Sequence, residues 1–137
     1  MTKPSIGFIG LGLMGSAMVQ RLLDLDYPLH VIANRSRENV DAATARGATE
    51  HTTSKDLAAA SDIVMLCIAT SVNVEARMMG DDGVIAGLKA GATVIDFGTS
   101  LPASTRMLGE KVAAAGGSML DAPLGRTPTH GRDGKLN

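Results

Sequence analysis

Three closely spaced glycines, Gly10, Gly12 and Gly15, are the residues of this 137-residue chain whose spacing most directly implies chemistry. They follow a short apolar run and precede a segment whose apolar residues recur at helical spacing. In a G-x-G-x-x-G turn between strand and helix, the first glycine allows a tight turn and the second lets the backbone approach a pyrophosphate. The third allows the helix to lie close to the strand. The pattern therefore predicts a dinucleotide site at a helix start, where N–H groups favour phosphate, although glycine-rich turns also occur in unrelated α/β domains.

The residues after the second apolar run bear on which dinucleotide would bind. Many such domains place an acid about 20 residues after the glycines, on the ribose 2′-hydroxyl. This chain has Asn34, Arg35 and Ser36 there, and no acid. A guanidinium can pair with a 2′-phosphate, and the two neutral side chains can add hydrogen bonds. The sequence thus favours NADP, with NAD as the second choice and Arg37 as a further candidate cation. The alternative is that both arginines are solvated residues at a helix start.

Composition and charge narrow the class of protein. Hydrophobic residues make up 45% of the chain, charged residues 20%, and the net charge is −1, as in an ordinary globular domain without a surface for nucleic acid. The single cysteine, Cys67, allows no intramolecular disulfide and suits a reducing cytoplasm. We see no signal peptide, no membrane-spanning run and no metal-ligand spacing. We therefore expect a cytoplasmic protein without membrane, nucleic-acid or metal partners.

Strand-like and helix-like patterns alternate along the chain, which predicts a parallel sheet with crossover helices. We expect strands near residues 5–9, 29–33, 48–51, 62–68, 92–97 and 118–122. We expect helices near residues 14–25, 36–45, 54–60, 72–79 and 102–115, with a short helical piece ending at 88. Ser36 and Ser54 are the predicted N-caps of the second and third helices, and the strand at 62–68 is predicted to be buried on both faces.

These patterns predict a Rossmann-type, doubly wound, mainly parallel α/β fold. We expect residues 1–137 to form one NADP-binding domain. The tail from residue 123 has a loop-like composition, and Leu136-Asn137 resembles the approach to a further strand. We therefore expect the domain to be truncated at its C-terminal end.

With these residues placed, the chain resembles the N-terminal domain of the β-hydroxyacid dehydrogenase family, which includes 3-hydroxyisobutyrate dehydrogenase, tartronate semialdehyde reductase and sulfolactaldehyde reductase. Three motifs spread over the chain carry the resemblance: Gly7–Met18, Asp96–Pro102 (similar to D-x-S-T-x-x-P) and Asp121–Leu124 (similar to D-A-P-V). The resemblance implies an NAD(P)-dependent interconversion of a β-hydroxyacid and its aldehyde or ketone. It also implies an all-α C-terminal domain, absent from this chain, and a homo-oligomeric full-length protein.

The resemblance assigns six further residues to the cofactor: Leu13, Met14, Cys67, Ile68, Ala69 and Thr99. The first two would lie under the pyrophosphate, the next three beside the adenosine, and the last near the nicotinamide ribose. Ligands of open α/β sheets do bind at such C-terminal strand ends. An ordinary hydroxyl at a helix start is the competing interpretation of Thr99.

The loop after the last predicted strand departs from the family's usual D-A-P-V-S-G-G. Gly125, Arg126 and Thr127 replace its serine and two glycines, as in sulfolactaldehyde-reductase-like members. A guanidinium is planar and permanently charged, and its paired N–H donors can bind a sulfonate, carboxylate or phosphate. Arg126 is therefore the candidate for binding a small anionic substrate, with Thr127 as its neutral partner. The alternative is that Arg126 is simply a charged residue of a surface loop.

The family's proton-transfer lysine, which has an asparagine nearby, lies on a helix beyond Asn137, and Lys135 precedes a missing strand. We therefore expect no catalytic residue in this chain, and cofactor binding without turnover. A non-catalytic dinucleotide-binding or interaction module is a second interpretation. A 6-phosphogluconate dehydrogenase-like enzyme or an imine reductase is a third. A lysine followed about four residues later by an asparagine, beyond Asn137, would separate the first interpretation from the second.

Overall fold

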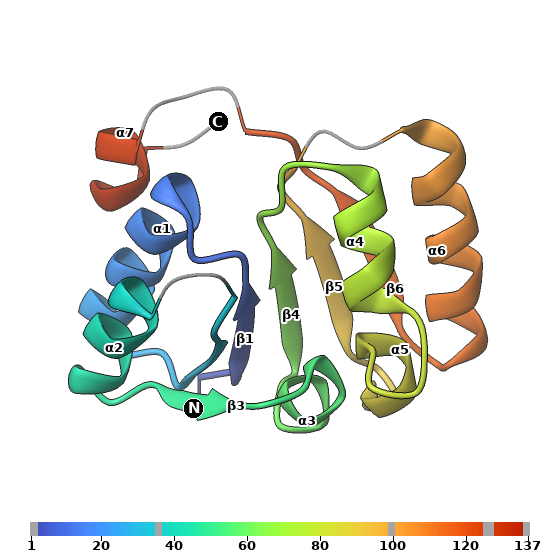
Figure 1. Cartoon of the computed structure of the whole chain (residues 1–137), viewed down its shortest axis with the longest axis horizontal. Helices are drawn as coiled ribbons and strands as arrows, with labels where there is room; N and C mark the ends of the chain where they lie inside the picture. The colour runs from blue at the N-terminus through green and yellow to red at the C-terminus, as the bar shows by residue number, and fades with distance from the viewer. Residues whose placement is uncertain (1–2, 35–36, 99–100, 125–127, 136–137) are drawn as a thin grey trace.

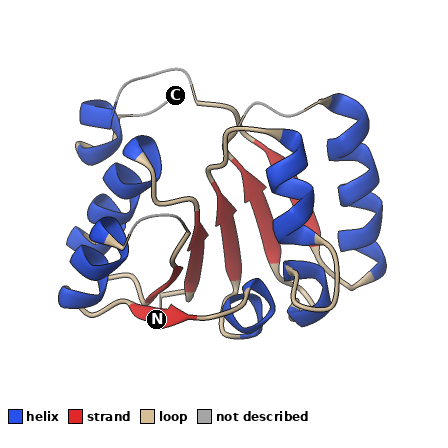
Figure 2. Cartoon of the chain, in the orientation of Figure 1, coloured by secondary structure: helices blue, strands red, loops and turns tan. Residues whose placement is uncertain are grey.

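One parallel sheet of six strands organises the molecule (Figures 1 and 2). The computed structural model describes residues 3–34, 37–98, 101–124 and 128–135. The strands are β1 (Ile6–Ile9), β2 (Leu29–Ile32), β3 (Thr49–His51), β4 (Ile63–Leu66), β5 (Thr93–Asp96) and β6 (Ser118–Asp121). Their order is β3-β2-β1-β4-β5-β6, with every neighbouring pair parallel. The chain thus winds outward from β1 in both directions, which confirms the predicted Rossmann-type, doubly wound fold.

Seven helices of the described residues flank the sheet. They are α1 (Leu13–Asp24), α2 (Glu38–Ala45), α3 (Ser54–Ala59), α4 (Ser71–Met78), α5 (Val84–Gly87), α6 (Pro102–Ala114) and α7 (Pro128–Arg132). Figure 1 shows α1, α2 and α7 grouped at one side of the molecule and α4, α5 and α6 at the other. None of the helices in these ranges has the length and apolar character needed to cross a membrane.

Two apolar cores lie on opposite faces of the sheet. On one face, α3 to α6 cover the strands and supply these buried residues: Leu57, Ala58, Val74, Met78, Val84, Leu108 and Val112. On the other face, α1 and α2 cover β1 and β2 around Phe8 and Val31, which are both 0% exposed. Because every second side chain of a strand points to the same face, β1, β2 and β4 contribute to both cores.

The prediction that the fourth strand is buried on both faces is wrong. Val64 and Leu66 are fully buried under α3 to α6, whereas Ile63 and Met65, on the face toward α1, are only half-buried. The same alternation continues along β5, and Leu120 of β6 is 54% exposed. The cause is the placement of α1 and α2. These helices cover β1 and β2 and leave much of the same face of β4, β5 and β6 open to solvent.

Two local predictions also need correction. The N-cap of α3 is Thr53, whose Oγ1 accepts a hydrogen bond from the Asp56 N–H at 3.1 Å, so the predicted cap Ser54 is instead the first helical residue. The tail after residue 123, predicted to be loop, contains α7. For α2, Arg37 occupies the N-cap position without a side-chain cap, and the predicted cap Ser36 lies outside the described residues.

Candidate dinucleotide-binding site

The turn between β1 and α1 is too tight for side chains at two of its glycines. Gly10 has φ of +104°, a conformation that other residues rarely adopt, and a Cβ there would overlap the carbonyl oxygen of Cys67. A Cβ on Gly15 would overlap the carbonyl oxygen of Gly10, because the first turn of α1 lies directly against the strand end. The backbone of β1, the turn and α1 thus pack against each other without intervening side chains.

Gly12 is different, because a Cβ placed on it would meet nothing within 4 Å. It occupies the N-cap position of α1 and makes no side-chain cap hydrogen bond. By contrast, Thr53 and Thr70 cap α3 and α4 with their hydroxyl groups. The first N–H groups of the 12-residue helix α1 therefore lack a side-chain acceptor and face open space beside Gly12. This arrangement fits a pyrophosphate, since both the N–H groups and the helix dipole favour an anion.

A cleft extends from this turn along the C-terminal ends of β1, β2 and β4. It consists of two adjoining hollows of about 390 Å³ and 230 Å³, which share Gly10, Asn34, Ile68 and Asn73. The larger hollow is also lined by Leu11, Gly12, Ile32, Val40, Cys67 and Ala69. The cleft lies where the strand order reverses between β1 and β4, the place at which open α/β sheets bind their ligands.

Several of the residues predicted to bind the cofactor come together here. The cleft lining includes Gly10, Gly12, Asn34, Cys67, Ile68 and Ala69. Leu13 and Met14 form the first turn of α1, with the Leu13 side chain 77% exposed and Met14 half-buried. The remaining predicted residues lie outside the described residues: Arg35, Ser36, Thr99, Gly125, Arg126 and Thr127.

The described lining of the two hollows contains one charged side chain, Arg77 of α4, and no carboxylate. Its Nη2 donates a hydrogen bond to Asn34 Oδ1 at 3.4 Å. The other candidate cation, Arg37, is engaged elsewhere: its guanidinium donates to both carboxylate oxygens of Glu50, at 2.8 and 3.0 Å, and to Asp41 at 3.2 Å. These carboxylates, Glu50 above all, raise the pKa of Arg37 and neutralise its charge. Arg37 therefore does not line the cleft as a free cation.

Two residues of the site escaped the sequence analysis. Asn39 of α2 donates from Nδ2 to the carbonyl oxygen of Leu11 at 2.6 Å and so ties the glycine turn to the next helix. Arg77 reaches the end of β2 from a helix that follows β4. Neither residue belongs to a sequence motif, and both contacts depend on which elements the fold brings together.

Cys67 lines the larger hollow, and Asp96 lies at the C-terminal end of the neighbouring strand β5. The buried carboxylate of Asp96 accepts a hydrogen bond from the Gly98 N–H at 2.9 Å and thereby holds the backbone after β5. Burial, and secondly the charge of Asp96, raises the pKa of the Cys67 thiol. A protonated thiol is a poor nucleophile, so Cys67 behaves here as a small apolar residue. No group of three or more potential metal ligands occurs in the part of the chain that the structure describes.

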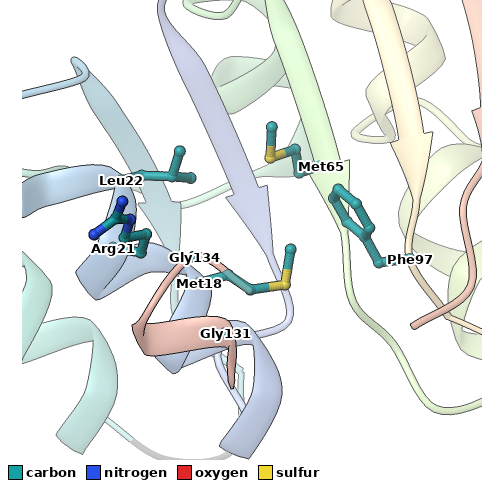
Figure 3. Close-up of a pocket in the computed structure, with 7 residues that line it drawn as sticks. All are labelled: Met18, Arg21, Leu22, Met65, Phe97, Gly131 and Gly134. Atoms are coloured by element: carbon teal, nitrogen blue, oxygen red, sulfur yellow. The ribbon is translucent and has the colours of Figure 1, made fainter. Parts of the chain in front are cut away.

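A separate, mostly apolar hollow of about 210 Å³ lies between α1, α7 and the ends of β4 and β5 (Figure 3). Its lining is Met18, Arg21, Leu22, Met65, Phe97, Gly131 and Gly134. An ion pair between Arg132 and Asp24 ties α7 to the end of α1. Asp24 also pairs with Arg46 at 2.7 Å, and the two guanidinium groups, Arg132 first, lower the pKa of this carboxyl. Among the described residues, Arg21 is the charged side chain that lines this hollow.

Comparison with known proteins agrees with this geometry. A family model described as the NAD binding domain of 6-phosphogluconate dehydrogenase matches residues 5–137. A probable 3-hydroxyisobutyrate dehydrogenase-like 2, mitochondrial, from Arabidopsis thaliana is 36% identical over 135 residues, which are 98% of this chain and 45% of that protein. A cytokine-like nuclear factor N-PAC from Xenopus tropicalis is 31% identical over 135 residues, which are 98% of this chain and 25% of that protein.

Among solved structures, Psf3 in complex with NADP+ and 2-OPP is similar with a TM-score of 0.87 and 33% identity, over 96% of this chain and 46% of that one. The chain thus spans less than half the length of each of these proteins. The matched family model, the parallel sheet and the glycine turn agree with each other. The chain belongs to the family of NAD-binding domains of 6-phosphogluconate dehydrogenase, as an N-terminal domain of the β-hydroxyacid dehydrogenase type.

Proposed function

We propose that this chain is the cofactor domain of an NADP-preferring oxidoreductase that interconverts a small anionic β-hydroxyacid, or a sulfonate analogue, and its aldehyde or ketone. The observation that carries the cofactor preference lies at the end of β2. Asn34 lines the cleft where other dinucleotide domains place an acid, and the described lining contains no carboxylate that would repel a 2′-phosphate. The NADP+ bound to the similar protein Psf3 supports the same preference.

The cofactor preference is tested by the Arg35→Asp variant. If Arg35 pairs with the 2′-phosphate, the variant loses a charge-assisted contact and gains a repulsion, so the dissociation constant for NADP should rise about 10- to 100-fold. The constant for NAD should change little. Isothermal titration calorimetry with both cofactors measures the two constants, and Arg106→Asp on α6 is the matched charge-reversal control. Equal losses for NADP and NAD would remove the 2′-phosphate role from Arg35.

We propose that the 137-residue chain binds cofactor without turnover. No lysine is among the described residues that line the cleft, and the family's proton-donating lysine is expected beyond Asn137. Mixing the chain with NADPH and small anionic aldehydes should leave the nicotinamide absorbance unchanged. Oxidation of NADPH that depends on the aldehyde would contradict this part of the proposal.

The anionic substrate is assigned to Arg126, with Thr127 and Gly125 in the same loop. In the full-length protein, Arg126→Ala should raise KM for the anionic substrate about tenfold or more, because it removes a charged hydrogen-bond donor. Cofactor affinity should stay within about twofold of the wild-type value, since the substrate and the adenosine bind at different strand ends. Unaltered substrate kinetics would exclude Arg126 from the site.

The same proposal places the full-length enzyme in the cytoplasm as a homo-oligomer. Cell fractionation can check the location, and size-exclusion chromatography can check the oligomeric state.

The similarity to nuclear factor N-PAC favours one alternative, a non-catalytic dinucleotide-binding or interaction module. Such a module would use the same glycine turn and cleft without a proton donor. The sequence following Asn137 separates the two functions. A lysine with an asparagine about four residues later supports the enzyme, and the absence of this pair from the full-length protein supports the module.

A further inference from the structure

We propose that Arg77, on α4, is a second cation for the 2′-phosphate of NADP and a determinant of cofactor specificity. The inference rests on the proposed function and extends it to a residue that lies 43 positions from its partner Asn34. Arg77 follows β4, whereas the residues usually assigned to the 2′-position follow β2. The fold brings the two together because β2 and β4 both flank β1.

The position of Arg77 in the cleft carries the proposal. Its side chain is half-buried and lines the smaller hollow together with Gly10, Asn34 and Ile68. That hollow adjoins the larger one, which is bounded by the glycine turn, and the two share Gly10, Asn34, Ile68 and Asn73. Arg77 therefore borders this cleft and bonds from α4 to Asn34 at the end of β2.

Charge distinguishes Arg77 from the other arginine near this site. Arg37 is paired with Glu50 and Asp41, which leave no net positive charge there for a phosphate. Arg77 has no carboxylate partner among the described residues, and its hydrogen-bond partner there, Asn34, is neutral. A guanidinium without a counter-charge, at the edge of a cleft without carboxylates, favours an anionic ligand.

The bond to Asn34 gives Arg77 a second effect. Because Asn34 Oδ1 accepts from the guanidinium, the Nδ2 amide group remains as a donor for a ligand. An anion at this point would meet N–H donors from both side chains. Arg77 therefore contributes charge directly and also orients the neutral donor beside it.

Binding of four small probes tests the proposal: NADP, NAD, adenosine 2′,5′-bisphosphate and 5′-AMP. The Arg77→Gln variant keeps most of the side-chain length and removes the charge. It should weaken NADP and the bisphosphate about tenfold, the scale of one charged hydrogen bond, and leave NAD and 5′-AMP within about twofold. Arg77→Lys should recover part of the NADP affinity. Lys111→Gln, which removes the same charge from α6, is the matched control and should change none of the four.

The outcomes separate this inference from the proposed function. Failure of the wild-type chain to bind either dinucleotide would overturn both, and a wild-type preference for NAD would overturn the NADP assignment together with the role of Arg77. If the wild-type chain prefers NADP but Arg77→Gln weakens NADP and NAD equally, Arg77 contacts the adenine or ribose and the specificity role is wrong. An unchanged NADP affinity in that variant would also overturn the inference. Circular dichroism spectra of each variant verify that the fold is retained.

Discussion

The three glycines of the β1–α1 turn have different physical roles, although the G-x-G-x-x-G motif specifies only that each of them is glycine. At Gly10 and Gly15 a Cβ would overlap backbone carbonyl oxygens, so these positions are closed by the protein itself. At Gly12 the space is open, and its φ of −76° is accessible to any residue. No described residue of the chain fills that space. Gly10 and Gly15 thus serve the fold, and Gly12 is the position at which an added side chain would compete with a pyrophosphate.

This difference predicts opposite results for two alanine variants. Gly15→Ala should lower the free energy of unfolding by about 2 kcal/mol or more, because the overlap forces α1 away from β1. Gly12→Ala should leave stability within about 0.5 kcal/mol but weaken dinucleotide binding about tenfold, since its methyl group would occupy the pyrophosphate's place. Urea denaturation and calorimetry measure the two effects. A Gly12→Ala variant that binds NADP normally would show that the phosphates do not approach this backbone.

At the scale of elements, the alternation of apolar runs with glycine and proline was enough to predict the approximate positions of the six strands and the class of fold. Caps were less predictable: Thr53 and Ser54 are adjacent hydroxyl residues, and only the extended backbone of Thr53 identifies it as the cap. The helix α7 has five residues, including a glycine, and its sequence lacks a helical signal. Its packing on α1 and the Arg132–Asp24 ion pair, which are tertiary contacts, stabilise it. Arg77 escaped prediction for the same reason.

The pairing of β2 and β3 includes a contact between two histidines that should respond to pH. His30 Nδ1 and His51 Nε2 lie 2.9 Å apart in one hydrogen bond, on the face of the sheet that also carries Ile32. Burial, then the charges of His51 and Lys89, lowers the pKa of His30 below its usual value. The unfolded chain therefore binds a proton at a higher pH than the folded chain, and stability is lost as pH falls below about 6.5.

We expect the free energy of unfolding to decrease between about pH 7 and pH 5, with part of this slope due to the histidine pair. His30→Gln removes the titrating group and should flatten the slope over that range. His51→Gln should also flatten it, because it removes a charge that acts on His30. Urea denaturation at a series of pH values measures the slope. Parallel curves for the wild-type chain and His30→Gln would contradict the assignment.

At the scale of the whole molecule, the two faces of the sheet are covered unequally. The helices α3 to α6 bury the residues of β4 and β5 that point toward them, including Leu66 and Val94, which are 0% exposed. On the opposite face, α1 and α2 cover β1 and β2, and the side chains of β6 remain open. The site lies at the boundary between the two halves of the sheet, where the strand order reverses between β1 and β4. Within the half of the sheet formed by β4, β5 and β6, stability should therefore depend chiefly on the face beneath α3 to α6.

Two leucines in strands provide a matched test of this asymmetry. Leu66 of β4 is 0% exposed beneath α3 to α6, whereas Leu120 of β6 is 54% exposed on the other face. Leu66→Ala should cost about 3 kcal/mol, because it removes a fully buried side chain and leaves a cavity in a packed core. Leu120→Ala should cost less than about 1 kcal/mol, since water already reaches much of the side chain. Urea denaturation followed by circular dichroism compares the two, with Leu66→Val as a milder variant if Leu66→Ala does not fold. Equal costs at the two positions would mean that the open face of β6 is covered in solution.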